Sequence, residues 1–219
     1  MAGQLREAGF EPEYLESGAP GRGNVFARLP GADPGRGALL IHGHLDVVPA
    51  EAADWSVHPF SGAVSDGYVW GRGAVDMKDM CGMMLAVARH FKRAGIVPPR
   101  DLVFAFVADE ESGGKYGAQW LVANRPDLFA GVTEAIGEVG GFSITLPRRD
   151  GGQRRLYLIE TAEKGLLWMR LTARGRAGHG SMIHDDNAVT AIASAVARIG
   201  SHQFPLMLTE SVEQFLTAV

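Results

Sequence analysis

The sequence predicts an α/β fold in which a mixed, largely parallel β-sheet is flanked by helices. Short apolar runs that end abruptly in polar residues are typical of buried strands. Amphipathic stretches with three-to-four spacing, typical of helices, lie between these runs. This alternation of strand and helix indicates a sheet with parallel members.

The first predicted strand lies in the segment GALLIHGHLDVVP, where the apolar run 38–41 gives way to polar residues and Pro49. The first predicted helix lies in DMKDMCGMMLAVARHFKRAG, which ends with Lys92, Arg93 and Gly95, a basic last turn and a C-cap. Its apolar positions have helical spacing: Met80, Met83, Met84, Val87, Ala88 and Phe91.

A second strand, a second helix and a third strand follow in order. Residues 102–108 are apolar and predict a buried strand, and YGAQWLVANR predicts a helix that stops before Pro126. The segment VTEAIGEVGG predicts a short strand that ends in a glycine loop. In open sheets of this kind ligands bind at the carboxyl ends of strands, and each acidic or histidine cluster of this sequence lies at such an end.

The character of the sequence changes after about residue 148. RRDGGQRR is a polar hairpin or linker, LLWMRLTARG alternates like a strand with one solvated face, and NAVTAIASAVARIG predicts an amphipathic helix closed by Gly200. We therefore expect a catalytic domain in residues 1–160 and the beginning of an α+β lid or dimerisation domain in residues 161–219.

Composition excludes several classes of protein. The chain is 46% hydrophobic and 21% charged with a formal charge of -4, which gives no reason to expect nucleic acid or an anionic membrane as a partner. Its longest apolar runs are far shorter than the roughly 18 residues of a membrane span, and its N-terminus has no signal-peptide core. Cys81 is the only cysteine, which favours a cytoplasmic location.

Two of the four polar clusters combine a histidine or a carboxylate with a strand end or a helix start. In HGHLDVVP, His44 and Asp46 are two residues apart and point the same way on an extended chain, so Asp46 can orient an imidazole that binds a metal. For an isolated H-x-D, a hydrogen-bonded histidine at a strand end is the favoured interpretation. In GRGAVDMKDM, glycines bring Asp76 close to a site, although a helix N-cap is the simpler role for a lone aspartate.

The other two clusters are acidic. ADEESGG places Asp109, Glu110 and Glu111 side by side after a buried strand, an arrangement that repulsion and desolvation disfavour unless a cation is present. An exposed acidic loop is the alternative. Glu138 in IGEVGGF follows the third strand, and on its own it does not indicate a functional site. Together the four clusters predict a site for zinc, cobalt or manganese built from carboxylates and one imidazole, without Cys81.

Six motifs occur in the order seen in one known family: HGHLDVVP, WSVHPF, GRGAVDMK, ADEESGG, GEVGGFS and GRAGHGS. The chain thus resembles family M20, which includes metallopeptidases, dipeptidases, aminoacylases and a desuccinylase. The resemblance implies two divalent metal ions, with zinc preferred over cobalt or manganese. It also implies a substrate that is a small peptide or an N-acyl amino acid, and a homodimer formed through the lid domain.

The resemblance also assigns roles to individual residues. His44 and Glu138 would bind one ion, with Asp46 orienting the His44 ring, and Glu111 would bind the other. Asp76 would bridge both ions. Glu110 would be the general base that activates water for attack on an amide carbonyl, and His179 of a partner subunit would stabilise the oxyanion. A cis peptide bond after Asp76 is also implied.

The sequence departs from the family pattern at its end. Family members continue through the lid and return to the catalytic domain, where a late histidine supplies the last metal ligand. No residue after Gly200 matches that position, so we expect a C-terminally truncated chain of low solubility. Two hypotheses remain open: a metal-dependent amidohydrolase or exopeptidase, or a catalytically inactive metal-binding fragment that needs the missing part.

Overall fold

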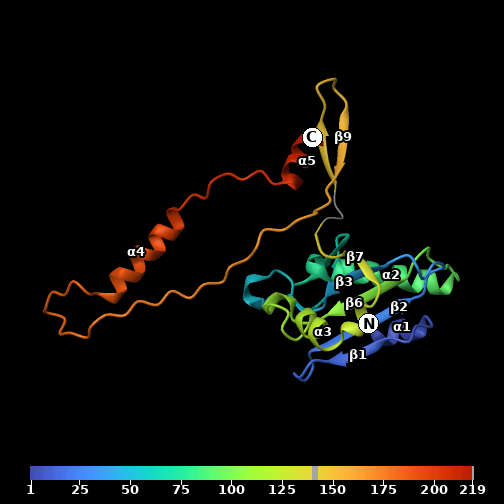
Figure 1. The fold of residues 1–219 in the computed structure, drawn as a ribbon, viewed down its shortest axis with the longest axis horizontal. Helices are drawn as coiled ribbons and strands as arrows, with labels where there is room; N and C mark the ends of the chain where they lie inside the picture. Colours follow the sequence, from blue (N-terminus) through green and yellow to red (C-terminus); the bar gives the residue numbers. More distant parts are fainter. Residues whose placement is uncertain (140–142, 219) are drawn as a thin grey trace. The chain divides into compact units, whose positions relative to one another are not determined.

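The chain forms two compact units, Met1–Val139 and Gly140–Val219, and is seen in a computed structural model that describes residues 1–139 and 143–218 (Figure 1). The expected functional division at residue 160 stays a prediction. The glycine loop predicted after Glu138 includes Gly140 and Gly141, which lie outside the described residues.

The first unit is built around a mixed sheet whose order is β1-β2-β6-β3-β7. Strand β3 pairs in parallel with β6 and β7, while β2 runs antiparallel to both β6 and β1. This architecture confirms the predicted α/β class. The strands are β1 Glu13–Glu16, β2 Gly23–Leu29, β3 Ala38–His44, β6 Leu102–Val107 and β7 Val132–Ile136, with a separate β4–β5 hairpin, Ala63–Ser65 and Tyr68–Trp70. The helices are α1 Ala2–Glu7, α2 Asp79–Arg93 and α3 Ala118–Asn124, with short helical segments at Ala52–Asp54, Ala74–Lys78, Glu110–Ser112 and Pro126–Phe129.

Side chains of β6 fill both faces of the sheet, because successive residues of a strand point to opposite sides. Phe104 and Phe106, both 0% exposed, pack with residues of α1 and α2 on one face. Val103, Ala105 and Val107 pack with residues of α3 and the turn after it on the other face. Burial of a phenylalanine side chain stabilises the folded state by about 1.5–3 kcal/mol, so β6 is a main source of the stability of this unit.

Helix α2 has the predicted position, and its end has the predicted form. Gly95 follows it with a left-handed φ of 64°, a conformation that suits glycine. The buried face differs from the predicted stripe, since it consists of Cys81, Met84, Leu85 and Ala88. Met83 and Val87 are exposed, because the helix meets the sheet along the line through Cys81 and Met84.

The second unit contains two strands and two helices in its described part. Strands β8 and β9, Ser143–Pro147 and Gln153–Tyr157, form an antiparallel hairpin. A hairpin was one of the two predictions for the segment RRDGGQRR, the other being a linker. Helix α4, Ala188–Ser201, begins at Asn187, whose side chain accepts hydrogen bonds from the N–H groups of Val189 and Thr190. Helix α5 spans Glu210–Ala218. The strand expected at residues 166–175 is absent there, since no described strand pairs with this segment to satisfy its backbone.

Among the described residues, no helix has both the length and the apolar character needed to cross a membrane.

Candidate metal centre

The candidate site lies where β3, β6 and β7 end. The parallel register pairs His44, the last residue of β3, with Val107 at the end of β6. Glu110 and Glu111 follow β6, and Glu138 follows β7. Because these strands are parallel neighbours, their carboxyl ends lie at one edge of the sheet, as the sequence predicted.

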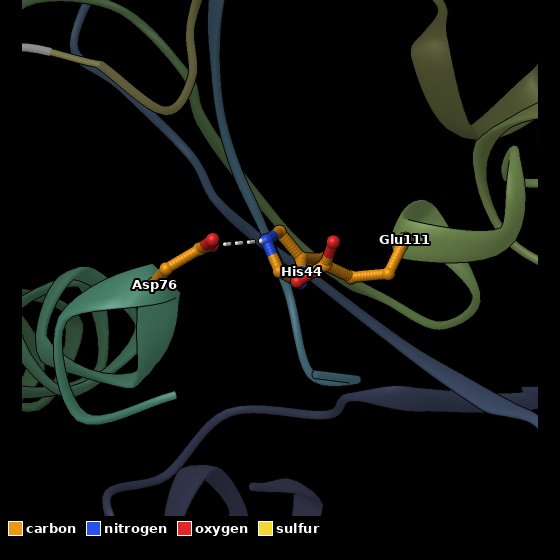
Figure 2. A group of neighbouring side chains, drawn as sticks. All are labelled: His44, Asp76 and Glu111. Carbon is orange, nitrogen blue, oxygen red and sulfur yellow. Dashed lines mark hydrogen bonds and ion pairs between the residues drawn. The ribbon is translucent and has the colours of Figure 1, made fainter. Parts of the chain in front are cut away.

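Asp76 reaches the same place from the segment before α2. Its Oδ1 lies 3.0 Å from the Nε2 atom of His44 (Figure 2). The peptide bond between Asp76 and Met77 is cis, as the resemblance implied.

The imidazole of His44 is at the centre of the site and is only 2% exposed. Besides Asp76, its Nε2 atom faces an oxygen of Glu138 at 3.5 Å and an oxygen of Glu110 at 3.9 Å. Its Nδ1 atom lies 3.0 Å from the backbone carbonyl oxygen of Asp46. A carbonyl oxygen can only accept a hydrogen bond, so Nδ1 carries a proton and Nε2 is the nitrogen that faces the carboxylates.

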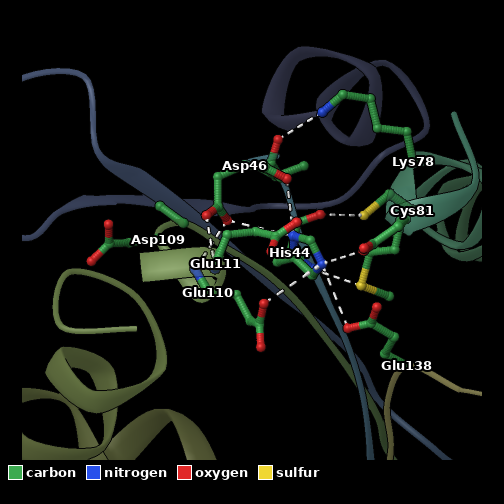
Figure 3. A network of polar contacts seen from close by, with 12 residues as sticks. His44, Asp46, Lys78, Cys81, Asp109, Glu110, Glu111 and Glu138 are labelled. Atoms are coloured by element: carbon green, nitrogen blue, oxygen red, sulfur yellow. Dashed lines mark hydrogen bonds and ion pairs between the residues drawn. The ribbon is translucent and has the colours of Figure 1, made fainter. Parts of the chain in front are cut away.

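Asp46 holds two parts of the site together. Its carboxylate accepts hydrogen bonds from the backbone N–H groups of Glu110 at 3.0 Å and Glu111 at 3.1 Å, and it lies 3.5 Å from Nδ1 of His44 (Figure 3). The sequence indicated only that Asp46 orients the imidazole. In the structure the closest contact to the ring comes from the Asp46 backbone, and the carboxylate fixes the loop after β6.

Within the part of the chain that the structure describes, two groups of side chains bring ligand atoms within 4.8 Å of one another: His44, Asp76 and Glu111, and His44, Glu110 and Glu138. The donor set of one imidazole nitrogen and several carboxylate oxygens suits zinc, manganese or cobalt. Figure 2 shows the side chains of Asp76 and Glu111 reaching His44 from opposite sides.

The electrostatics of the site fit a bound cation. Burial raises the pKa of Glu110, and the charges of Glu111, Asp46 and Asp76 add to this effect, while His44 opposes it. Burial also raises the pKa of Glu138, followed by its hydrogen bond with Asp76 and the charge of Asp76. Carboxylates that resist ionisation because of their neighbours are stabilised in the charged form by a divalent ion.

The pKa of His44 shows the same excess of negative charge. Burial alone lowers it, but the hydrogen bond to the Asp46 carbonyl and the charges of Glu138, Glu110 and Asp46 outweigh burial, so the pKa is raised.

The segment after Asp76 holds the end of β3. The Sδ atom of Met77 accepts a hydrogen bond from the N–H of His44 at 3.2 Å, and the thiol of Cys81 donates one to the His44 carbonyl at 3.2 Å. Lys78 Nζ donates to the carbonyl of Leu45 at 2.7 Å. Cys81 therefore supports the backbone of the site (Figure 3).

The side chain of Asp109 points away from Glu110 and Glu111. The sequence did not predict this orientation. Asp109 adopts a left-handed φ of 67°, is 3% exposed, accepts a hydrogen bond from the N–H of Tyr116 at 3.2 Å and pairs with Arg22 at 3.4 Å. The run of three acids is therefore tolerated in part because one of them has its own cation. No local pattern around Arg22 signals this pairing.

His179 belongs to the second unit. Its Nδ1 atom lies 2.8 Å from the hydroxyl of Ser181, and its expected role at the active site stays a prediction.

Comparison with known proteins gives a consistent picture. A family model described as peptidase family M20/M25/M40 matches residues 40–219. Succinyl-diaminopimelate desuccinylase from Methylorubrum populi is 36% identical over 193 residues, which cover 84% of this chain and 46% of that protein. Aminoacylase-1 from Sus scrofa is 33% identical over 186 residues, which cover 84% of this chain and 43% of that protein.

Solved structures share the fold. Human carnosine dipeptidase 1 matches with a TM-score of 0.58 at 21% identity, covering 100% of this chain and 48% of that one. The dipeptidase Dug1p from Saccharomyces cerevisiae matches with a TM-score of 0.53 at 26% identity, covering 66% of this chain and 35% of that one. The chain spans less than half the length of the two curated relatives named above.

Proposed function

Because the chain belongs to peptidase family M20/M25/M40, we propose that it forms the metal-binding part of a hydrolase that cleaves an amide or peptide bond next to a carboxylate-bearing amino acid. The observation that carries the proposal is the convergence of a buried imidazole, His44, with the carboxylates of Asp76, Glu110 and Glu138 around its Nε2 atom. Substrates of this class are small peptides and N-acyl amino acids.

The proposed ligands divide between two ions. His44 and Glu138 would hold one ion, Glu111 the other, and Asp76 would bridge them. We propose zinc, with cobalt and manganese as alternatives that the same donor set accepts. Two such ions would lower the pKa of a water molecule and polarise the carbonyl of the scissile bond.

Glu110 is the proposed general base. It is held beside the other acidic groups by the hydrogen bond between its own N–H and Asp46, and its raised pKa brings its proton affinity closer to neutral pH, where a base and an acid are both effective. Glu110 takes a proton from the attacking water and returns it to the leaving amine. His179 would donate a hydrogen bond to the developing oxyanion from the partner subunit of a homodimer.

We also propose a domain organisation and a cellular location for the protein. Residues 1–160 would form the catalytic domain and residues 161–219 part of the lid through which two copies associate. A cytoplasmic location fits the single cysteine.

The experiment is metal analysis of the purified 219-residue chain, combined with hydrolysis of a panel of dipeptides and N-acyl amino acids. We expect two zinc ions per chain, turnover of at least one substrate, and loss of turnover in Glu110→Gln with the metal retained. Glu51→Gln changes an exposed glutamate outside the site and should behave like the wild type. One ion or none without turnover, or undiminished turnover in Glu110→Gln, would contradict the proposal.

A further inference from the structure

We propose that Asn24, a residue of β2 outside the metal centre, is a positioning residue for the loop that carries Glu110 and Glu111. It acts through a set of polar residues, of which Ser17, Asn24 and Asp109 are buried, that links the β1–β2 hairpin to this loop. We call this set the hairpin–loop network: Ser17, Arg22, Asn24, Asp109 and Tyr116.

Asn24 uses both ends of its side chain and is 1% exposed. Its Oδ1 atom accepts a hydrogen bond from the N–H of Ala108 at 2.9 Å. Its Nδ2 group donates to the carbonyls of Tyr116 at 3.0 Å and Leu15 at 3.3 Å. Both amide hydrogens are thus occupied, and the opposite orientation would place the NH2 group against the N–H of Ala108. The contacts therefore fix the orientation of this side chain.

Other members of the network hold the same loop. The hydroxyl of Ser17, which is 3% exposed, also contacts the carbonyl of Tyr116 and lies 3.1 Å from the carbonyl of Arg22. Asp109 accepts from the N–H of Tyr116 and pairs with Arg22. Both backbone groups of Tyr116 are therefore bound by buried side chains.

The network closes the loop at its two ends, Ala108 and Tyr116. These ends approach closely, since a Cβ atom added to Gly117 would lie 1.8 Å from the carbonyl oxygen of Ala108. Between them lie Glu110 and Glu111, whose N–H groups bind the carboxylate of Asp46. The loop is therefore held by Asp46 on the side of the metal centre and by Asn24 at its base.

Removal of the Asn24 side chain removes one of the two attachments of the loop and leaves the one to Asp46. The buried N–H of Ala108 would lose its side-chain acceptor, and the loop would gain freedom at the strand end from which Glu110 projects. Outer partners that orient catalytic or metal-binding groups are typically worth roughly 10- to 100-fold in metal affinity or activity. The catalytic part of this proposal depends on the proposed function, whereas the attachment of the loop does not.

The experiment compares Asn24→Ala with the wild type and with Asn124→Ala. The side chain of Asn124 is a matched control, since it is exposed and donates only to the Trp120 carbonyl of its own helix, at 2.9 Å. Hydrogen exchange of the intact metal-free chain is followed by mass spectrometry in peptides that cover residues 108–117 and in peptides that cover α2. Zinc affinity is measured by competition with a chelating dye, and kcat and KM on the best substrate of the panel.

We expect Asn24→Ala to accelerate exchange in residues 108–117 while α2 exchanges as in the wild type. Zinc affinity and kcat should each fall by roughly 10- to 100-fold, with KM nearly unchanged. Asn124→Ala should alter none of these quantities.

Unchanged exchange in residues 108–117, or an equal increase in α2, would overturn the proposal, because the latter indicates a general loss of stability. If Asn24→Ala does not fold, Ser17→Ala removes one contact to the Tyr116 carbonyl and is judged by the same exchange comparison. If the wild-type chain does not hydrolyse any substrate, the proposed function fails, and the exchange comparison still decides whether Asn24 holds the loop.

Discussion

The carboxylate of Asp46 accepts a hydrogen bond from the backbone N–H of Glu110 at 3.0 Å, so a residue after β3 fixes the position of the proposed base after β6. The same carboxylate binds the N–H of Glu111 at 3.1 Å. Hydrogen bonds to a charged acceptor are stronger than those between neutral groups. Asp46 therefore sets the spacing between the histidine side and the glutamate side of the metal centre.

Asp46→Asn tests this linkage. The variant keeps the size of the side chain but presents an NH2 group to one of the two N–H groups, so the loop after β6 should shift. We expect turnover and zinc affinity to fall by roughly 10- to 100-fold. Steady-state kinetics and zinc competition measure the effect, and Asp54→Asn, a change at an exposed aspartate away from the site, should leave both unchanged. Equal kinetics in Asp46→Asn and the wild type would show that the carboxylate does not position Glu110.

Zinc should stabilise the protein more at pH 7.5 than at pH 5. The pKa values of Glu110 and Glu138 are raised, in each case by burial first and then by neighbouring carboxylates. A carboxyl group whose pKa is higher in the folded state than in the unfolded state binds its proton more tightly in the folded state. Its contribution to stability is present below the unfolded-state pKa and is lost as the pH rises through the folded-state pKa. The metal-free protein therefore carries uncompensated repulsion at neutral pH, which a cation relieves. Thermal unfolding with and without zinc at the two pH values measures this, and an equal shift at both would contradict it.

Glu138→Gln distinguishes the charge repulsion that Glu138 causes in the metal-free protein from its proposed role as a zinc ligand. Removing one charge should raise the unfolding temperature of the metal-free protein at pH 7.5, while the additional stabilisation by zinc should become smaller. At 100 times the dissociation constant, zinc would stabilise the wild type by about 2.7 kcal/mol. Glu51→Gln, which removes a charge outside the site, should leave the zinc effect intact. A Glu138→Gln protein that gains as much from zinc as the wild type would show that Glu138 is not a ligand.

Cys81 should be inert to thiol reagents in the folded protein. Burial raises its pKa to about 11, and its thiol donates to the His44 carbonyl. Because the pKa of this thiol is higher in the folded state than in the unfolded state, the stability it contributes is present at pH 8 and is lost as the pH rises through about 11. Reaction with a chromogenic disulfide at pH 8 should be slow in the native chain and rapid in urea. Rapid reaction of the native chain would contradict the burial of this thiol.

Local patterns predicted strands β3, β6 and β7, helix α2 and the polar clusters that meet at the candidate metal centre, because the parallel arrangement brings strand ends together. Strands β1 and β2 and helix α1 were not predicted. The direction of Asp109 was not predictable, since its partner Arg22 is far away in the sequence. The dual role of Asp46 was also hidden, because it depends on backbone N–H groups that have no sequence signature. The strand expected at residues 166–175 did not form, since an alternating pattern needs a neighbouring strand as well.

Gly43 provides a test of how closely α2 must approach the metal centre. A Cβ atom added there would lie 3.0 Å from the methyl carbon of Met77 and 3.2 Å from both the Cys81 and the Met84 sulfur atoms. Gly43→Ala should therefore push the segment after Asp76 away from His44, with a loss of roughly 1–3 kcal/mol of stability from overpacking and weaker zinc binding.

Gly82→Ala is the matched control, since an added Cβ atom meets nothing within 4 Å and the residue lies in α2. It should stabilise the protein by roughly 0.5–1 kcal/mol, because alanine favours a helix over glycine. Urea unfolding followed by near-ultraviolet circular dichroism, together with zinc competition, measures both variants. If Gly43→Ala were as stable as Gly82→Ala and bound zinc equally well, the contact of these sulfur atoms with Gly43 would not be a constraint on the site.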